Sequence, residues 1–176
     1  MHIIFFLIKK IVFITLSFVL YLLVLYLFPH PFSLINVFFA TATMHLFLRE
    51  SFSIIWYVFL VHFCVELYST QPFGIIVFSA VISALVMFWL YQHVFTNKSW
   101  YTAGGLVFCT LLVYRILYVS IFFMLSAFGY TTMFPLSDIY QSFVWEIFLT
   151  TMCSVVLHLI LTKSFVELQR DRVRYI

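Results

Sequence analysis

The stretch FGIIVFSAVISALVMFWLYQHVF, from Phe73 to Phe95, contains no Asp, Glu, Lys or Arg in 23 residues. A helix needs about 20 consecutive apolar residues to cross the roughly 30 Å hydrocarbon core of a bilayer. The polar segment TNKS, residues 96–99, follows directly. This stretch therefore predicts a membrane-spanning helix that ends at a polar loop.

The composition extends this prediction to the whole chain. Of its 176 residues, 65% are hydrophobic, 22% are aromatic and only 9% are charged. Soluble domains have about 45–50% apolar and about 25% charged residues. With only 4 glycines and 4 prolines, the chain is also unlike collagenous or disordered sequences. We expect an all-α polytopic membrane protein.

Five further segments resemble Phe73–Phe95 in their apolar character. The predicted spans are Ile11–Phe28, Phe32–Leu48, Ser51–Tyr68, Phe73–Phe95, Trp100–Phe128 and Ser142–Thr162. Phe32–Leu48 is short and polar in places, so whether it crosses fully stays open. The expected organisation is a single six-helix transmembrane domain over residues 1–162, followed by a short basic cytoplasmic tail over residues 163–176.

The positions of the basic residues predict the orientation. Cytoplasmic ends of membrane proteins carry an excess of Lys and Arg. With six spans and a cytoplasmic N-terminus, eight of the nine basic residues lie at cytoplasmic ends: Lys9, Lys10, Arg49, Lys98, Lys163, Arg170, Arg172 and Arg174. The predicted outer loops contain none. Both termini are therefore expected in the cytoplasm.

Three charged residues lie inside the predicted spans, namely Glu66, Arg115 and Glu146. Such residues are expensive in a bilayer, so each is a functional hypothesis. We expect Arg115 to reach toward both carboxylates and to form a structural clamp between helices. A transport site, a proton relay or a contact with a partner remain alternatives. Glu146, Thr150 and Cys153 share one helical face, which predicts that this face turns inward.

Signatures of enzymes and of bound cofactors are missing from the sequence. There is no phosphate-binding loop, no HExxH and no nucleophile motif. The three cysteines have no metal-binding spacing, and His62 with Glu66 would supply only two ligands. We therefore expect no catalytic residue, no cofactor, no metal and no nucleic-acid partner.

One segment resembles a known family. Residues 63–74 read FCVELYSTQPFG, an acidic residue followed by a turn and by Pro72, Phe73 and Gly74. This segment resembles MreD, the rod shape-determining membrane protein family. The loop over residues 94–99 and the small residues that open the next span are also similar, so the specific part covers the 40 residues from Glu66 to Gly105. Family members usually have an aspartate preceded by glycines, whereas here Glu66 follows His62 and Cys64.

The resemblance implies a non-enzymatic scaffold of the bacterial cell-elongation machinery, which directs rod shape and peptidoglycan synthesis. The protein would lie in the bacterial cytoplasmic (inner) membrane as a multi-pass protein. Its partners, besides the lipid bilayer, would be an MreC-like protein and cell-wall synthesis proteins. The turn Pro72–Phe73–Gly74 would shape the outer face, and the basic ends would face the cytoplasmic machinery.

Two other function classes stay open from the sequence. The first is the substrate-binding membrane component of an energy-coupling-factor-type vitamin transporter, which also has six spans and about this size. In that class Glu66, Arg115 and Glu146 would line an outward-facing pocket, and the long outer loop Gly129–Gln141 would cover it. The second is a structural membrane protein outside both classes. Charges exposed to an outer cavity would favour transport, whereas charges buried in mutual pairing would favour a scaffold.

Overall fold

A computed structural model describes the backbone of residues 2–129 and 136–174, and the side chains of residue 8 and of residues 10–129 and 141–163. The described residues form six α-helices and one 3₁₀ helix. The elements are α1 (His2–Leu27), η1 (Phe32–Leu34), α2 (Val37–Arg49), α3 (Ser53–Leu67), α4 (Ile75–His93), α5 (Trp100–Ala127) and α6 (Leu136–Arg174). Helices are thus the only regular secondary structure among the described residues, as the composition predicts.

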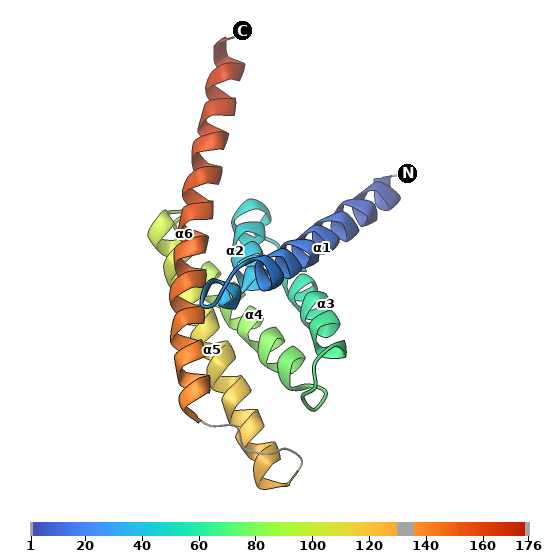
Figure 1. The fold of residues 1–176 in the computed structure, drawn as a ribbon. Helices are drawn as coiled ribbons and strands as arrows, with labels where there is room; N and C mark the ends of the chain where they lie inside the picture. Colours follow the sequence, from blue (N-terminus) through green and yellow to red (C-terminus); the bar gives the residue numbers. More distant parts are fainter. Residues whose placement is uncertain (1, 130–135, 175–176) are drawn as a thin grey trace.

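The helices form a bundle in which neighbours in sequence are mostly neighbours in space. α3 packs on α4, α4 on α5, and α5 on α6, while α2 contacts α1, α3, α5 and α6. In Figure 1, α1 runs diagonally across the bundle, and α6 continues well beyond its other helices toward the C-terminus. The N-terminal end of α1 and the C-terminal end of α6 lie toward the top of that view, and the α3–α4 connection and the C-terminal end of α5 lie toward the bottom.

Four of the helices are long and apolar enough to cross a membrane. Their apolar segments are Lys10–Leu27, Ile75–His93, Trp100–Ala127 and Gln141–Lys163. α2 and α3 are also apolar but have only 13 and 15 residues, fewer than the roughly 20 needed to span a bilayer. The structure therefore supports a helical membrane protein with four spanning candidates, and the six-span count remains a prediction.

The predicted span Phe32–Leu48 is wrong at its start. Residues 32–34 form the short helix η1, and α2 begins only at Val37. The cause is Asn36, whose side chain accepts a hydrogen bond from the backbone N–H of Phe39 at 3.3 Å. An Asn in this position satisfies a backbone donor that the first turn leaves unpaired, and so fixes the first residue of the helix.

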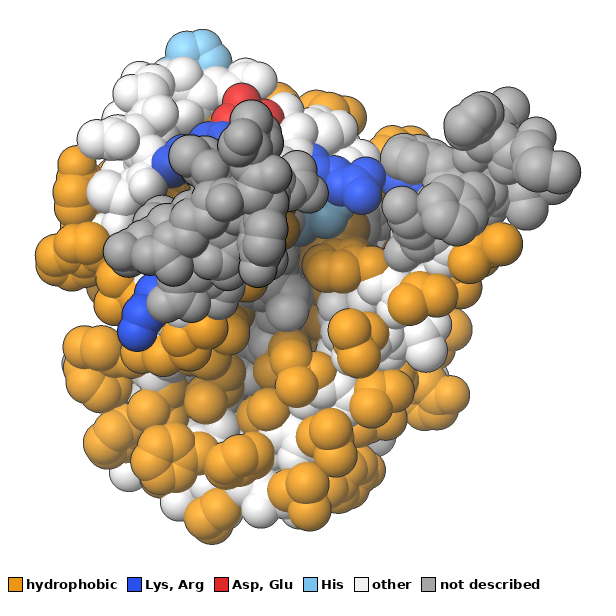
Figure 2. Space-filling view, turned by 90° about the horizontal axis from the view of Figure 1, so that it is seen from above, with side chains coloured by type: hydrophobic (Ala, Val, Ile, Leu, Met, Phe, Trp, Pro, Cys, Tyr) orange, Lys and Arg blue, Asp and Glu red, His pale blue; other side chains and the backbone are white. Residues whose placement is uncertain are grey.

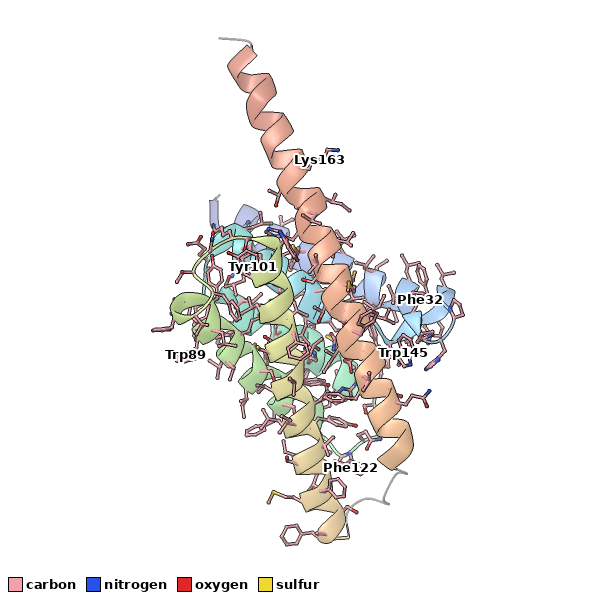
Figure 3. The ribbon with its side chains drawn as sticks, turned by 90° about the vertical axis from the view of Figure 1, so that its left-hand side faces the viewer. Phe32, Trp89, Tyr101, Phe122, Trp145 and Lys163 are labelled. Carbon is pink, nitrogen blue, oxygen red and sulfur yellow. The ribbon has the colours of Figure 1, made fainter. Side chains whose placement is uncertain are left out.

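Apolar side chains cover most of the outer surface. α1 exposes Ile11, Val12 and Leu16 at 60%, 57% and 64%. Trp89 on α4 points outward at the edge of the bundle in Figure 3 and is 55% exposed, and Trp145 on α6 is 39% exposed. Such a surface suits contact with lipid rather than with water.

Small residues line the inner contacts of α4 and α5. Ser79, Ala80, Ser83 and Ala84 are all 0% exposed, and the two serine hydroxyls donate to backbone carbonyls one turn earlier at 2.7 Å. On α5, a Cβ added at Gly104 would lie 3.0 Å from Cγ2 of Val155 on α6. Small residues of this kind let membrane helices approach closely.

We expect Gly104→Val to lower the thermal stability of the protein in detergent by about 1–3 kcal/mol, because the added methyl groups would force α5 and α6 apart. Adding Val155→Ala should recover part of this loss, although Val155→Ala alone is destabilising. Thermal unfolding of the two single variants and the double variant measures the coupling. Strictly additive losses would show that the two positions do not meet.

Candidate functional site: the buried charges

The carboxylate of Glu66 caps the N-terminus of α4. Its Oε1 accepts hydrogen bonds from the backbone N–H groups of Gly74 at 2.8 Å and Ile76 at 3.0 Å, and its Oε2 accepts one from Val77 at 3.2 Å. The residue is 3% exposed. The first turn of a helix has unpaired N–H donors and the positive end of the helix dipole, so it stabilises a carboxylate.

The turn Pro72–Phe73–Gly74 brings these donors to Glu66. Gly74 has φ 105° and ψ −23°, a left-handed conformation that glycine adopts without steric cost. This conformation lets the chain reverse directly into α4 beside the end of α3. Phe73 is 69% exposed, and its ring meets that of Phe63 edge-on at 6.0 Å. The turn motif is thus the structural partner of the buried Glu66.

A second buried carboxylate, Glu146 on α6, pairs with Arg115 on α5. Nε and Nη2 of Arg115 both contact Oε2 of Glu146. The side chain of Glu146 is 5% exposed and that of Arg115 is 24% exposed. The guanidinium also lies 5.6 Å from the ring centre of Tyr114 and 5.7 Å from that of Tyr118. Aromatic faces and a carboxylate together compensate the loss of water around the cation.

The same carboxylate connects α6 to the start of α2. The side-chain amide of Asn36 donates to Oε1 of Glu146 at 3.0 Å, and the backbone N–H of Asn36 donates to the Thr150 hydroxyl at 2.8 Å. Asn36 in turn caps α2 through Phe39. Glu146 therefore holds α5 and the first turn of α2 on α6.

The expected cluster of Glu66, Arg115 and Glu146 is divided into two sites. Arg115 binds Glu146, whereas Glu66 binds the N-terminus of α4 instead of the guanidinium. The interpretation that Arg115 reaches both carboxylates is wrong in this respect, because backbone donors of the Gly74 turn take up Glu66. Sequence reasoning also missed Asn36. The sequence does contain a signal for this residue, because an Asn directly before a long apolar run is a typical helix N-cap.

His62, four residues before Glu66 on α3, packs among aromatic rings inside the bundle. Nδ1 of His62 lies 2.9 Å from the carbonyl of Val58. Its ring packs against Phe39 at 5.2 Å and Tyr114 at 6.0 Å. Among the described residues, no group of three or more His, Cys, Asp or Glu side chains is placed to hold a metal ion.

The basic ends lie in the part of the bundle that carries both termini. Lys98, in the α4–α5 loop, forms an ion pair with Glu50, which follows α2. The hydrogen bond from Lys98, with one from Tyr91, holds the pKa of Glu50 below its usual range. Lys163 projects from α6 beyond the neighbouring helices (Figure 3). The side chains of Lys9, Arg170, Arg172 and Arg174 lie outside the described residues.

An open groove of about 380 Å³ lies between α5 and α6. Aromatic and aliphatic side chains dominate its walls, which are formed by Phe108, Leu112, Phe143, Val144, Ile147, Phe148, Thr151 and Met152. Neither Arg115 nor Glu146 lines it. The groove therefore suits apolar contact with a lipid chain or helix, and it offers no charge to a polar solute.

Comparison of the chain with protein-family models, with curated proteins and with solved structures gives no match.

We expect Glu66→Gln to lower the stability of the protein by about 1–2 kcal/mol, since the amide cannot accept hydrogen bonds at both ends as the carboxylate does. Thermal unfolding in detergent is the measurement. Glu50→Gln is the control, because Glu50 forms an exposed ion pair and its loss should change the midpoint less. Equal shifts for the two variants would contradict the capping role of Glu66.

We expect Arg115→Met to destabilise the protein by about 3–5 kcal/mol, since it leaves the Glu146 carboxylate buried without its cation. The double variant Arg115→Met/Glu146→Gln should be more stable than Arg115→Met alone. Combining Arg115→Met with Glu66→Gln should instead give additive losses, because the two sites share no partner. Unfolding midpoints of the set test this, and rescue by Glu66→Gln would show that the guanidinium serves Glu66 as well.

Proposed function

We propose that this protein is a non-enzymatic integral membrane scaffold of the bacterial cell-elongation machinery, similar to MreD. It would bind an MreC-like protein and cell-wall synthesis proteins through its helices. The resemblance of residues 66–105 suggests this machinery, and the arrangement of the buried charges supports a scaffold.

One observation carries the proposal. Each of the three described charges within the predicted spans is bound by other groups of the same chain. Glu66 binds three backbone N–H groups of the α4 turn. Arg115 and Glu146 bind each other, and Asn36 takes the second carboxylate oxygen. A substrate site needs charges that exchange their partners when a solute arrives. Here the charges hold helices together, which is the requirement of a rigid scaffold.

We also propose the six-span topology with both termini in the cytoplasm of a bacterial cell. α2 and α3 would then be short spans. The bilayer would become thinner around them, at a modest free-energy cost for each ångström by which the helix is too short. The presence of both chain ends at one end of the bundle supports an even number of crossings (Figure 1).

The vitamin-transporter alternative receives less support. It requires the three charges to face an outer cavity. Glu66 and Glu146 are both 3% exposed, and the groove between α5 and α6 offers no charged group.

Affinity purification of the tagged protein from its native host in mild detergent, followed by mass spectrometry, tests the proposal. We expect an MreC-like protein and cell-wall synthases to copurify. The double variant Arg115→Met/Glu146→Gln should recover the same partners, because these side chains act within the bundle. Its unfolding midpoint is measured in parallel, so that a loss of partners is compared only between folded proteins.

Recovery of ATPase subunits in place of these partners would overturn the scaffold proposal and favour transport. Recovery of neither would overturn the assignment to the elongation machinery. Loss of MreC-like partners from the folded double variant would contradict the structural role given to the charge pair.

A further inference from the structure

Glu50 ends α2 in a backbone conformation that glutamate seldom adopts. Its φ is 48° and its ψ is 31°, in the left-handed region. Among the described residues it is the only residue other than glycine with a positive φ. The residue that follows a helix in this conformation is usually glycine, because glycine has no Cβ to clash with the backbone. A glutamate here carries a backbone cost, which the contacts of its side chain must offset.

The side chain of Glu50 joins two chain reversals that are far apart in sequence. Its carboxylate forms an ion pair with Nζ of Lys98. Glu50 lies in the short connection between α2 and α3, whereas Lys98 lies in the loop between α4 and α5. One ion pair therefore holds the α2–α3 turn against the α4–α5 loop.

The α4–α5 loop holds Lys98 in a fixed segment of chain. On one side, the Thr102 hydroxyl at the start of α5 donates to the carbonyl of Asn97 at 2.6 Å. On the other, the ring of Phe95 lies 3.2 Å from the position that a Cβ on Gly105 would occupy. The loop is thus bound to α5 on both sides of Lys98. When the pair opens, we expect the movement to occur on the side of Glu50, where the left-handed residue can relax.

The two ends of α2 are held by carboxylate contacts of different kinds. At its start, the Asn36 amide donates to Glu146, whose side chain is 5% exposed. At its end, the side chains of Glu50 and Lys98 are 53% and 50% exposed. Figure 2, which views this end of the bundle from above, shows an acidic side chain at the surface with basic side chains beside it. An exposed ion pair is weak and is screened by salt, whereas a buried pair is screened much less.

We propose that the Glu50–Lys98 pair is a latch that keeps the α2–α3 turn closed against the α4–α5 loop, and that the ionic strength of the solution sets how often it opens. High salt weakens the pair, and Glu50 then leaves its left-handed conformation. The device is independent of the proposed scaffold function, since it requires no partner.

Packing in the turn before Glu50 limits how far the opening extends. The ring centre of Phe47 lies 5.5 Å from that of Tyr91 on α4 and 5.2 Å from that of His158 on α6. Phe47 is buried at 6% exposure. The helix up to Phe47 therefore stays in the core, and the latch controls only the few residues that follow it.

Hydrogen exchange of the full-length protein in an uncharged detergent, followed by mass spectrometry, tests the latch. The peptide of interest covers residues 48–55, and one that covers residues 36–44 is the internal reference. We expect residues 48–55 of wild-type protein to exchange about 3-fold faster at high salt than at low salt, as the loss of an exposed ion pair predicts. Glu50→Gln should exchange about 3-fold faster than wild type already at low salt, and salt should change its rate little.

Two further variants separate the ion pair from a general effect of charge. The exchanged pair Glu50→Lys/Lys98→Glu keeps both charges in contact, so it should recover slow exchange at low salt and the response to high salt. Lys163→Gln is the matched control, because it removes one positive charge from the same end of the bundle, and it should behave like wild type.

An equal response to salt in wild type and Glu50→Gln would overturn the latch, because salt would then act elsewhere. Fast exchange in the exchanged pair would also overturn it, since contact between the two charges would not be what closes the turn. Faster exchange of residues 36–44 in Glu50→Gln would show that the pair supports the whole helix, and would contradict a local device. Unfolding midpoints measured in parallel confirm that all compared variants are folded.

Discussion

A charge inside a bilayer has no water to stabilise it, so the protein itself must supply every partner. In this bundle that requirement decides how the helices meet. The Glu146 carboxylate binds the Arg115 guanidinium of α5 and the Asn36 amide before α2. The Glu66 carboxylate binds backbone donors of the turn into α4. Each charge is thus a fixed point at which two or three helices are joined.

Both buried glutamates act at the beginning of another helix. Glu66 caps α4 directly, and Glu146 orients Asn36, which caps α2 through Phe39. A helix that begins inside the membrane leaves up to four N–H donors unpaired, and each would be costly in hydrocarbon. A carboxylate supplies both the acceptors and the negative charge that the helix dipole favours. This explains how α2 and α4 can start within an apolar bundle.

The inside and the surface of the bundle differ in what they offer to other molecules. Inside, caps and an ion pair engage the charges of Glu66, Arg115 and Glu146, an arrangement that suits a rigid scaffold better than a solute site. Outside, the apolar faces of α1, α5 and α6 suit contact with a lipid bilayer, and basic residues gather at the end that carries the termini. Function is therefore expected to depend on surfaces, and the buried charges serve it by keeping those surfaces in place.

The amino-acid sequence by itself determined the helical membrane class, because long apolar runs have few other stable arrangements in water or lipid. It also singled out Glu66, Arg115 and Glu146, since a charge within an apolar run is conspicuous. Only the tertiary structure decided their partners. Residues 66 and 74 meet because Gly74 turns the chain back, and Asn36 meets Glu146 across 110 positions of sequence. Sequence spacing predicts contacts along one helix, whereas contacts between helices depend on how all of them pack.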